Sequence, residues 1–196
     1  MARFMGPRFK LARHLGVNVF NHPKALKRGV KQHHKLSEYG EQLLEKQKLK
    51  AIYGMLSEKQ LVRYFKEAQQ KEENTAQLLA EMLECRLDVM VYRLKLAQTI
   101  FGAQQLVSHG HVLVNGKKVD IPSFRVRPGT VIEIKENSRG ILQIKQGLEL
   151  ASKKGNTPSW LEVNAEQFKG TFTRMPKMDE ISVPVDVQVI IELYSK

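Results

Sequence analysis

Cysteine is nearly absent from this sequence, since Cys85 is the only one in 196 residues. A single thiol excludes an internal disulfide and any zinc site built from four cysteines. Long apolar runs are also missing, and no segment approaches the roughly 18 residues that a membrane-spanning helix needs. With 42% hydrophobic and 27% charged residues, the composition indicates a folded globular protein with room for a core. The basic start lacks a continuous apolar segment, which argues against a secretory signal and leaves an organellar transit peptide open.

Acidic residues are missing from the first 35 positions, which carry nine lysines and arginines. The net charge of the chain is +12, and residues 1–50 contribute +9 of it. A block of one sign repels itself unless a polyanion neutralises it, whereas a solvated helix face mixes both signs. The charge pattern therefore favours nucleic acid as the partner. The alternatives are charge kept for solubility and an anionic membrane surface, which would require an apolar face opposite the charge.

Glycine and proline interrupt residues 1–35, so we expect an irregular basic arm there. A helical segment follows from Ser37, with apolar residues at helical spacing between Leu49 and Leu56. Ser57 and Gln60 form a capping-box pattern that predicts the start of a second helix. A third helix is expected over 75–84.

The stretch that follows predicts two short helices and a hairpin. Asp88 and Thr99 are the expected N-caps of the helices. Asn115-Gly116 signals a two-residue hairpin turn, because both positions of such a turn require a positive φ. Pairing across the turn is expected to place Val112, Val114, Val119 and Ile121 on one face and His111, Leu113, Lys118 and Asp120 on the other.

The rest of the chain adds strands and one helix to this pattern. A turn at Pro128-Gly129 precedes an alternating strand over 130–134. A helix is expected over 143–152, and strands over 160–163 and 168–174. Apolar residues alternate from Val185 to Leu193, which predicts a last strand with one apolar face. The fold class predicted is α+β.

Histidines provide the only candidates for a metal site. His109 and His111 have the spacing of two ligands on one strand, but no nearby cysteine completes a tetrahedral set, and His33-His34 has the same shortage. A structural or RNA-facing role is favoured, with an ion pair between His111 and Asp120 as an alternative for His111. We expect no metal and no cofactor.

The stretch from Leu87 to Gly129, LDVMVYRLKLAQTIFGAQQLVSHGHVLVNGKKVDIPSFRVRPG, resembles the α-L RNA-binding motif. Further segments, among them GPRFKLARHLG, SEKQLVRYF, PSWLEV and GTFTRMP, are similar to the bacterial-type S-four family of small-subunit ribosomal proteins. The resemblance covers nearly the whole chain. It implies a basic RNA-binding arm over 1–36, a helical domain over 37–85 to which 184–196 returns, and an α-L domain with an antiparallel sheet over 86–183.

The function that this resemblance implies is structural. Such a protein binds the 5′ domain of small-subunit ribosomal RNA at a multi-helix junction and nucleates assembly on the ribosome, in the cytoplasm or in an organelle. With its neighbour, the S-five protein, it supports accuracy near the channel where messenger RNA enters, and in some bacteria it represses its own operon. No enzymatic activity and no membrane partner are expected.

Two rival functions share the motif. Some pseudouridine synthases carry it, and their catalytic aspartate lies in an Arg-Leu-Asp triplet like that of residues 86–88. In those enzymes the triplet follows the motif, whereas Asp88 precedes it here, so a capping role is favoured. A stress or tRNA-binding module is the other rival, and the similarity outside residues 87–129 argues against it.

The sequence also departs from the family pattern. Many members have four zinc-binding cysteines near the N-terminus, which are absent here, so RNA must hold the arm. GVKQHHKLSEYG stands where the family has Pro-Gly-Gln-His-Gly, which makes Lys31, His33, His34 and Lys35 candidates for messenger RNA. Gln104 occupies a position where arginine is common.

The expected mechanism is a rigid display of cations toward structured RNA, which proteins read by shape and by phosphate and 2′-hydroxyl contacts. The arm is expected to order on binding, and Tyr92 is a candidate for stacking on a base. The candidate RNA-binding residues of the arm are Arg3, Arg8, Lys10, Arg13, Lys24, Lys27, Arg28, Lys31 and Lys35, and those of the helical segment are Lys46, Lys48 and Lys50. Those of the motif are Arg86, Arg93, Lys95, Gln104, Gln105, His109, His111, Asn115, Lys117 and Lys118.

Overall fold

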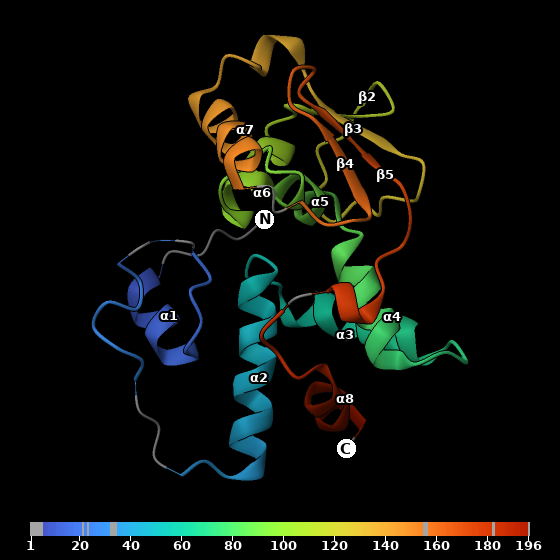
Figure 1. Ribbon diagram of the computed structural model, residues 1–196. Coiled ribbons are helices and arrows are strands. Elements are labelled where there is room, and N and C mark those ends of the chain that lie inside the picture. Colours follow the sequence, from blue (N-terminus) through green and yellow to red (C-terminus); the bar gives the residue numbers. More distant parts are fainter. Residues whose placement is uncertain are drawn as a thin grey trace. The chain divides into compact units, whose positions relative to one another are not determined.

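The computed structural model describes residues 6–20, 22, 24–31, 35–154, 157–181 and 183–195 (Figure 1). The chain divides into two compact units, one made of residues 1–79 and 182–196 and the other of residues 80–181. The division falls inside helix α4 (Thr75–Glu84). The predicted α+β class is confirmed. Within the described ranges, no helix combines the length and the apolar character needed to cross a bilayer.

The first unit is helical, and α2 and α3 begin where the sequence predicted. It contains α1 (Arg8–Leu15), α2 (Glu38–Ile52), α3 (Glu58–Gln69) and α8 (Val187–Ser195). The Ser37 hydroxyl accepts a hydrogen bond from the Gly40 N–H at the start of α2. Ser57 and Gln60 form the predicted capping box at the start of α3.

Helix α1 lies in the part of the chain that was expected to be irregular, and that prediction is wrong for these eight residues. Ala12 and Leu15, three positions apart, are buried, at 0% and 1% exposure. Gly16 ends the helix with a φ of 70°. The glycines and prolines of this region therefore bound a short helix, and its two buried apolar residues lie on one side of it.

The predicted C-terminal strand is also wrong, because residues 187–195 form α8. Val187 and Ile190 are buried at helical spacing, at 3% and 0% exposure. The Asp186 carboxylate accepts hydrogen bonds from the N–H groups of Gln188 and Val189 and so caps the helix. The run VQVIIELY satisfies a period of two and a period of 3.6 at once, and the cap together with burial on one side selects the helix.

A carboxylate at the start of α3 joins three helices of this unit. Glu58 accepts hydrogen bonds from Lys46 at 3.1 Å and Lys50 at 2.8 Å, both on α2, and from the Tyr194 hydroxyl of α8 at 2.6 Å. Burial raises the pKa of Glu58, but the hydrogen bonds from Lys50, Tyr194 and Lys46 outweigh it and lower this pKa to about 2. The ring of Tyr194 also packs on that of Phe65, with centroids 5.1 Å apart.

The second unit is a sheet covered on one side by helices (Figure 1). Its helices are α5 (Leu87–Arg93), α6 (Ile100–Ser108) and α7 (Leu142–Lys154), with short 3₁₀ turns at Glu136–Ser138 and Met178–Glu180. Its strands are β1 (Val112–Val114), β2 (Lys117–Lys118), β3 (Val131–Ile134), β4 (Leu161–Asn164) and β5 (Lys169–Phe172). They form one antiparallel sheet in the order β2-β1-β3-β5-β4.

One hydrophobic core joins these elements. Its fully buried members include Leu94 between α5 and α6, Val107 on α6, Ile144 on α7 and Phe172 on β5. Two glycines allow the layers to approach closely. A Cβ on Gly147 of α7 would collide with the carbonyl oxygen of Lys95, and one on Gly170 would collide with the Leu94 side chain. The helices are thereby held in fixed positions against the sheet.

The predicted hairpin is confirmed in its turn and register. Asn115 and Gly116 have φ of 48° and 77°, Val114 pairs with Lys117, and the Val119 N–H bonds to the Val112 carbonyl. Ile121 departs from the prediction, because its side chain is 56% exposed. The ladder of β2 ends at Lys118, so the alternation of faces does not extend to Ile121.

The Glu58 contacts predict how the first unit responds to acid. Because the folded pKa is lowered from 4.5, the stability that Glu58 contributes is present above about pH 4.5 and is lost as the pH falls toward 2. Since 45% of the side chain is exposed, solvent screening limits this contribution to about 1 kcal/mol. Glu58→Gln should lower the free energy of unfolding by about that amount at pH 7 and flatten its acid dependence.

Urea unfolding followed by far-ultraviolet circular dichroism between pH 7 and pH 3 checks this prediction. The exposed Glu72 gives a matched control, and Glu72→Gln should behave like the unaltered protein. An acid dependence unchanged by Glu58→Gln would contradict the prediction.

Candidate RNA-binding surface

The hairpin lysines occupy the edge of the sheet. Lys117 and Lys118 form β2 and are both exposed. The Lys118 side chain lies against Gly110, where a Cβ would collide with its Cε, and Gly110 itself has a φ of 71°. Asn115, a candidate for RNA contact, exchanges hydrogen bonds with the Val131 main chain through its Oδ1 at 2.8 Å and its N–H at 2.9 Å. Asn115 therefore fixes the turn to β3, which holds the two lysines in place.

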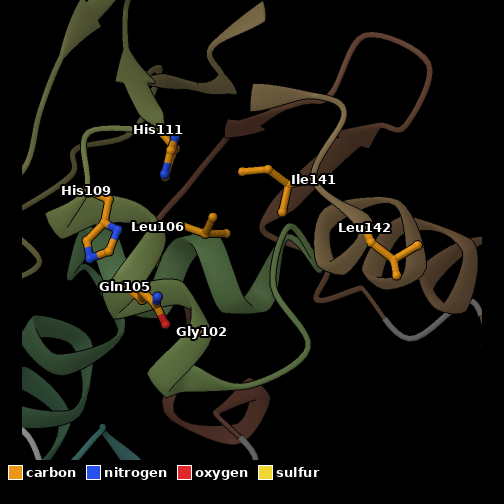
Figure 2. Close-up of a pocket in the computed structure, with 7 residues that line it drawn as sticks. All are labelled: Gly102, Gln105, Leu106, His109, His111, Ile141 and Leu142. Atoms are coloured by element: carbon orange, nitrogen blue, oxygen red, sulfur yellow. The ribbon is translucent and has the colours of Figure 1, made fainter. Parts of the chain in front are cut away.

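The exposed side of α6 continues this surface. Gln105 and His109 are exposed, and both line a pocket that also includes His111 (Figure 2). The Nδ1 atom of His111 lies 2.8 Å from the Ser138 hydroxyl oxygen. The described contact of His111 is thus with Ser138, in place of the ion pair with Asp120 that was an alternative.

Arg86 differs from the expectation of a surface cation, because its side chain is 2% exposed. Its guanidinium donates two hydrogen bonds to the Asp88 carboxylate, from Nε at 3.0 Å and Nη2 at 2.7 Å. The Gln104 amide donates to the same carboxylate at 3.1 Å. Arg86 therefore belongs to an interior network, which is a correction to its expected place on the RNA-facing surface, while the half-buried Gln104 reaches that network through its amide.

Asp88 also departs from its expected capping role. Arg86 is the N-cap of α5, and Asp88 lies in the first turn. The N–H groups of Leu87 and Asp88 bond to the carbonyls of Phe124 and Pro122, so the carboxylate is free to pair with Arg86. Burial raises the pKa of Asp88, and the Arg86 guanidinium opposes that shift.

The remaining candidates at the end of α5 and just after it have partners of their own. Arg93 donates to the buried Glu84 carboxylate at 3.0 and 2.6 Å, which offsets its charge. The Lys95 ammonium lies 5.6 Å from the centroid of the Tyr92 ring, and covers the ring that was a candidate for stacking on a base. Lys95 has a φ of 59°, a backbone conformation that is uncommon for a residue other than glycine.

The three lysines of α2 are half-buried and paired. Lys46 and Lys50 bond to Glu58, and Lys48 pairs with Glu45. The exposed side-chain fraction is 16% for Lys46, 24% for Lys50 and 20% for Lys48. Lys46 and Lys50 thus connect α2 to α3, and Lys48 pairs within α2, so none of the three is the free surface cation that was expected.

The arm presents most of its cations to solvent. Arg13 is half-buried and donates from Nε to the Gly29 carbonyl at 3.0 Å, while Arg8 lies 5.9 Å from the ring of Phe20. Arg3, His33 and His34 fall outside the described residues. The other arm candidates, all exposed, are Lys10, Lys24, Lys27, Arg28, Lys31 and Lys35.

No metal centre is formed by the part of the chain that the structure describes, since no three His, Cys, Asp or Glu side chains gather there as ligands. Cys85 is 2% exposed, and its Sγ lies 3.7 Å from the Met175 sulfur. Burial, together with Glu81 and Glu84, raises the pKa of its thiol to about 12. The thiol is therefore a packed side chain of low reactivity, as interpreted from the sequence.

Three residues of this surface were not among the candidates. Ile141 and Leu142 line the pocket opposite the histidines, and the exposed Lys135 follows β3, with its N–H bonded to the His111 carbonyl. They follow the hairpin strand β2 in sequence without being adjacent to it, and the pairing of β3 beside β1 brings them near. In the sequence, the one available signal for this part of the surface was the apolar pair Ile141-Leu142, just before the helix expected over 143–152.

The fold and its exposed cations define a class of protein. Residues 85–132 match the S4 domain, an RNA-binding module, and residues 3–84 match the ribosomal protein S4/S9 N-terminal domain. The small ribosomal subunit protein uS4B of Clostridium acetobutylicum is 52% identical over 196 residues, which cover all of both chains. The uS4 proteins of Chlamydia muridarum and Aquifex aeolicus are each 48% identical, with all of this chain and 99% and 100% of theirs covered. The chain therefore belongs to the uS4 family of small ribosomal subunit proteins, as its motifs predicted.

The buried network yields a prediction about stability. Asp88→Ala should lower the free energy of unfolding by about 3–5 kcal/mol, because it leaves the Arg86 guanidinium buried without its carboxylate. Removing both charges in Arg86→Leu with Asp88→Leu should recover most of that loss. Fluorescence of Trp160, the only tryptophan and 3% exposed in the core of this unit, follows the unfolding in urea.

Asp120→Ala removes an exposed carboxylate from the same unit and is the control, with an expected change within about 0.5 kcal/mol. A loss in Asp88→Ala no larger than in Asp120→Ala would show that the buried pair is not needed for stability.

Proposed function

We propose that this protein is a structural component of the small ribosomal subunit that binds ribosomal RNA through the exposed cations of its arm and of its hairpin. The observation that carries this proposal is the family match along the whole chain, together with a display of exposed lysines on a rigid sheet edge. The site of action is the ribosome.

The physical basis is electrostatic. Lys117 and Lys118 and the arm present positive charge without nearby acidic partners in the contacts described, and such cations release counterions from RNA phosphates on binding. Preformed helices and strands display the hairpin charges without a cost of ordering, so RNA of matching shape is favoured. The arm contributes charge over a longer reach, and its contacts with RNA take the place of the zinc site that some relatives of this family use.

The proposal extends to the RNA target and to the neighbours of the protein on the ribosome. The RNA target is the 5′ domain of the small-subunit ribosomal RNA, bound early so that assembly starts there. The S-five protein is the proposed neighbour, and the arm residues Lys31 and Lys35 face the messenger RNA as it enters, where they support accuracy.

A catalytic role in RNA modification has little support at Asp88, the one catalytic candidate. The Asp88 carboxylate is 0% exposed and is occupied by Arg86, Gln104 and the Val89 N–H. A catalytic aspartate must reach its substrate, and this carboxylate has no such access.

Charge reversal at the hairpin tests the RNA-binding proposal. Lys117→Glu with Lys118→Glu should weaken binding to a 5′-domain RNA fragment and reduce the slope of log affinity against log salt by about 2, because two phosphate contacts are lost. Filter binding at several salt concentrations measures both quantities.

Lys66→Glu with Lys71→Glu makes the same charge change at exposed positions of the helical unit, and should leave the slope much closer to that of the unaltered protein. Equal slopes for the hairpin variant and the unaltered protein would refute the proposed role of the two lysines.

A further inference from the structure

An open pocket of about 410 Å³ lies between α6 and the start of α7 (Figure 2). Figure 2 shows the side chains of His109 and His111 on one side of it and those of Ile141 and Leu142 on the other. Its volume is near the lower end of the range of about 300–1,000 Å³ found for small-molecule sites. A single flat ring system fits such a space, whereas a helix or strand of a partner does not.

The walls have a mixed character. Leu106 forms part of the floor at 5% exposure, and Leu142 stands 67% exposed at the rim, an apolar surface that gains from being covered. The imidazole rings of His109 and His111 lie 6.0 Å apart with a tilt of 45°. The exposed Gln105 amide adds a donor and an acceptor. Aromatic and apolar walls with hydrogen-bonding groups at the edge suit a heteroaromatic ring.

The surroundings are positively charged. Gly110 separates the two histidines, and the Lys118 side chain lies on it. Lys135 is exposed next to His111, whose carbonyl accepts its N–H at 2.9 Å. A ligand whose ring enters the pocket can therefore place an attached phosphate near a lysine. This combination favours a nucleotide over an apolar side chain of a protein partner.

We propose that this pocket receives one unpaired, unstacked base of the bound RNA. The proposal rests on the RNA-binding function proposed above and adds recognition of a base to recognition of charge and shape. Sequence-specific recognition of RNA generally uses bases that are splayed out and stacked on aromatic side chains. His111, held by Ser138, and His109 at the end of α6 form the stacking side, and Leu142 covers the opposite face of the base.

Pocket variants test this proposal by affinity and by salt dependence together. His109→Ala and Leu142→Ala should each weaken binding to the 5′-domain RNA fragment by about 5- to 150-fold, the range measured for the loss of one stacked base. The salt slope should stay unchanged, because no phosphate contact is removed. His109→Phe keeps an aromatic ring and should restore most of the affinity lost in His109→Ala.

Ile121→Ala is the control for Leu142→Ala, because Ile121 is a 56% exposed aliphatic residue of the same unit outside the pocket. It should bind like the unaltered protein. Trp160 fluorescence during urea unfolding establishes that the variants are folded. Affinities of His109→Ala and Leu142→Ala equal to that of Ile121→Ala would overturn the base pocket.

Chemical probing identifies the base. Dimethyl sulfate and a carbodiimide report the pairing edges of the RNA bases, and the unaltered protein should protect one unpaired base whose reactivity returns with His109→Ala and with Leu142→Ala. Protection that is identical in all proteins would contradict the proposal.

The two proposals fail in different ways. If the hairpin charge reversal leaves RNA binding unchanged, the proposed role of the hairpin lysines in RNA binding is refuted. Binding that responds to the charge reversal but not to the pocket variants leaves the proposed function intact and refutes only the pocket.

Discussion

A buried pair of opposite charges fixes the arrangement on which the RNA-binding unit depends. Arg86 and Asp88 lie inside the fold, and Gln104 of α6 completes the set of donors to the carboxylate. The main chain around them bonds to the loop that follows the hairpin, through Phe124 and Pro122. One charged centre thus orients α5, α6 and this loop together. An apolar cluster of the same size would hold them about as firmly, whereas removal of one charged partner alone would not.

Close contacts also hold the surface side chains of this unit in place. Gly147 lets α7 approach the Lys95 carbonyl, and Gly110 lets the Lys118 side chain lie flat against the corner between α6 and β1. Asn115 ties the hairpin turn to β3. The cations of the hairpin are therefore held by main-chain structure on both sides, so little conformational freedom remains to be lost when RNA binds. The arm differs, since most of its exposed cations lie outside its one described helix, α1.

Local signals in the sequence were enough for much of this fold. The capping box at Ser57 and the turn at Asn115-Gly116 depend on residues that are adjacent in the chain, and both were predicted correctly. The last segment was predicted as a strand because its apolar residues fit a strand and a helix equally. The Asp186 cap and the burial of one side select the helix. Arginine at position 86 suggested a surface cation, but its guanidinium is buried against the Asp88 carboxylate, and its charge alone gave no sign of that burial.

The surface itself was predicted in part. The exposure of Lys117, Lys118, Gln105 and His109 agrees with a role in RNA contact, which remains a proposal. Charge alone could not separate these from Lys46, Lys48 and Lys50, whose acidic partners come from other turns or other helices. The apolar wall opposite His109 was missed because composition and charge carry no information about which distant segments fold together.

The short strand β2 has a consequence for the protein before it meets any RNA. A sheet ends there in unpaired main-chain groups, to which another copy of the chain could add a strand. Two residues offer too little length for such an addition, and two ammonium groups side by side repel a second copy that carries the same pair. The two lysines that suit this edge to a polyanion also keep newly made copies of the chain from associating until a polyanion binds.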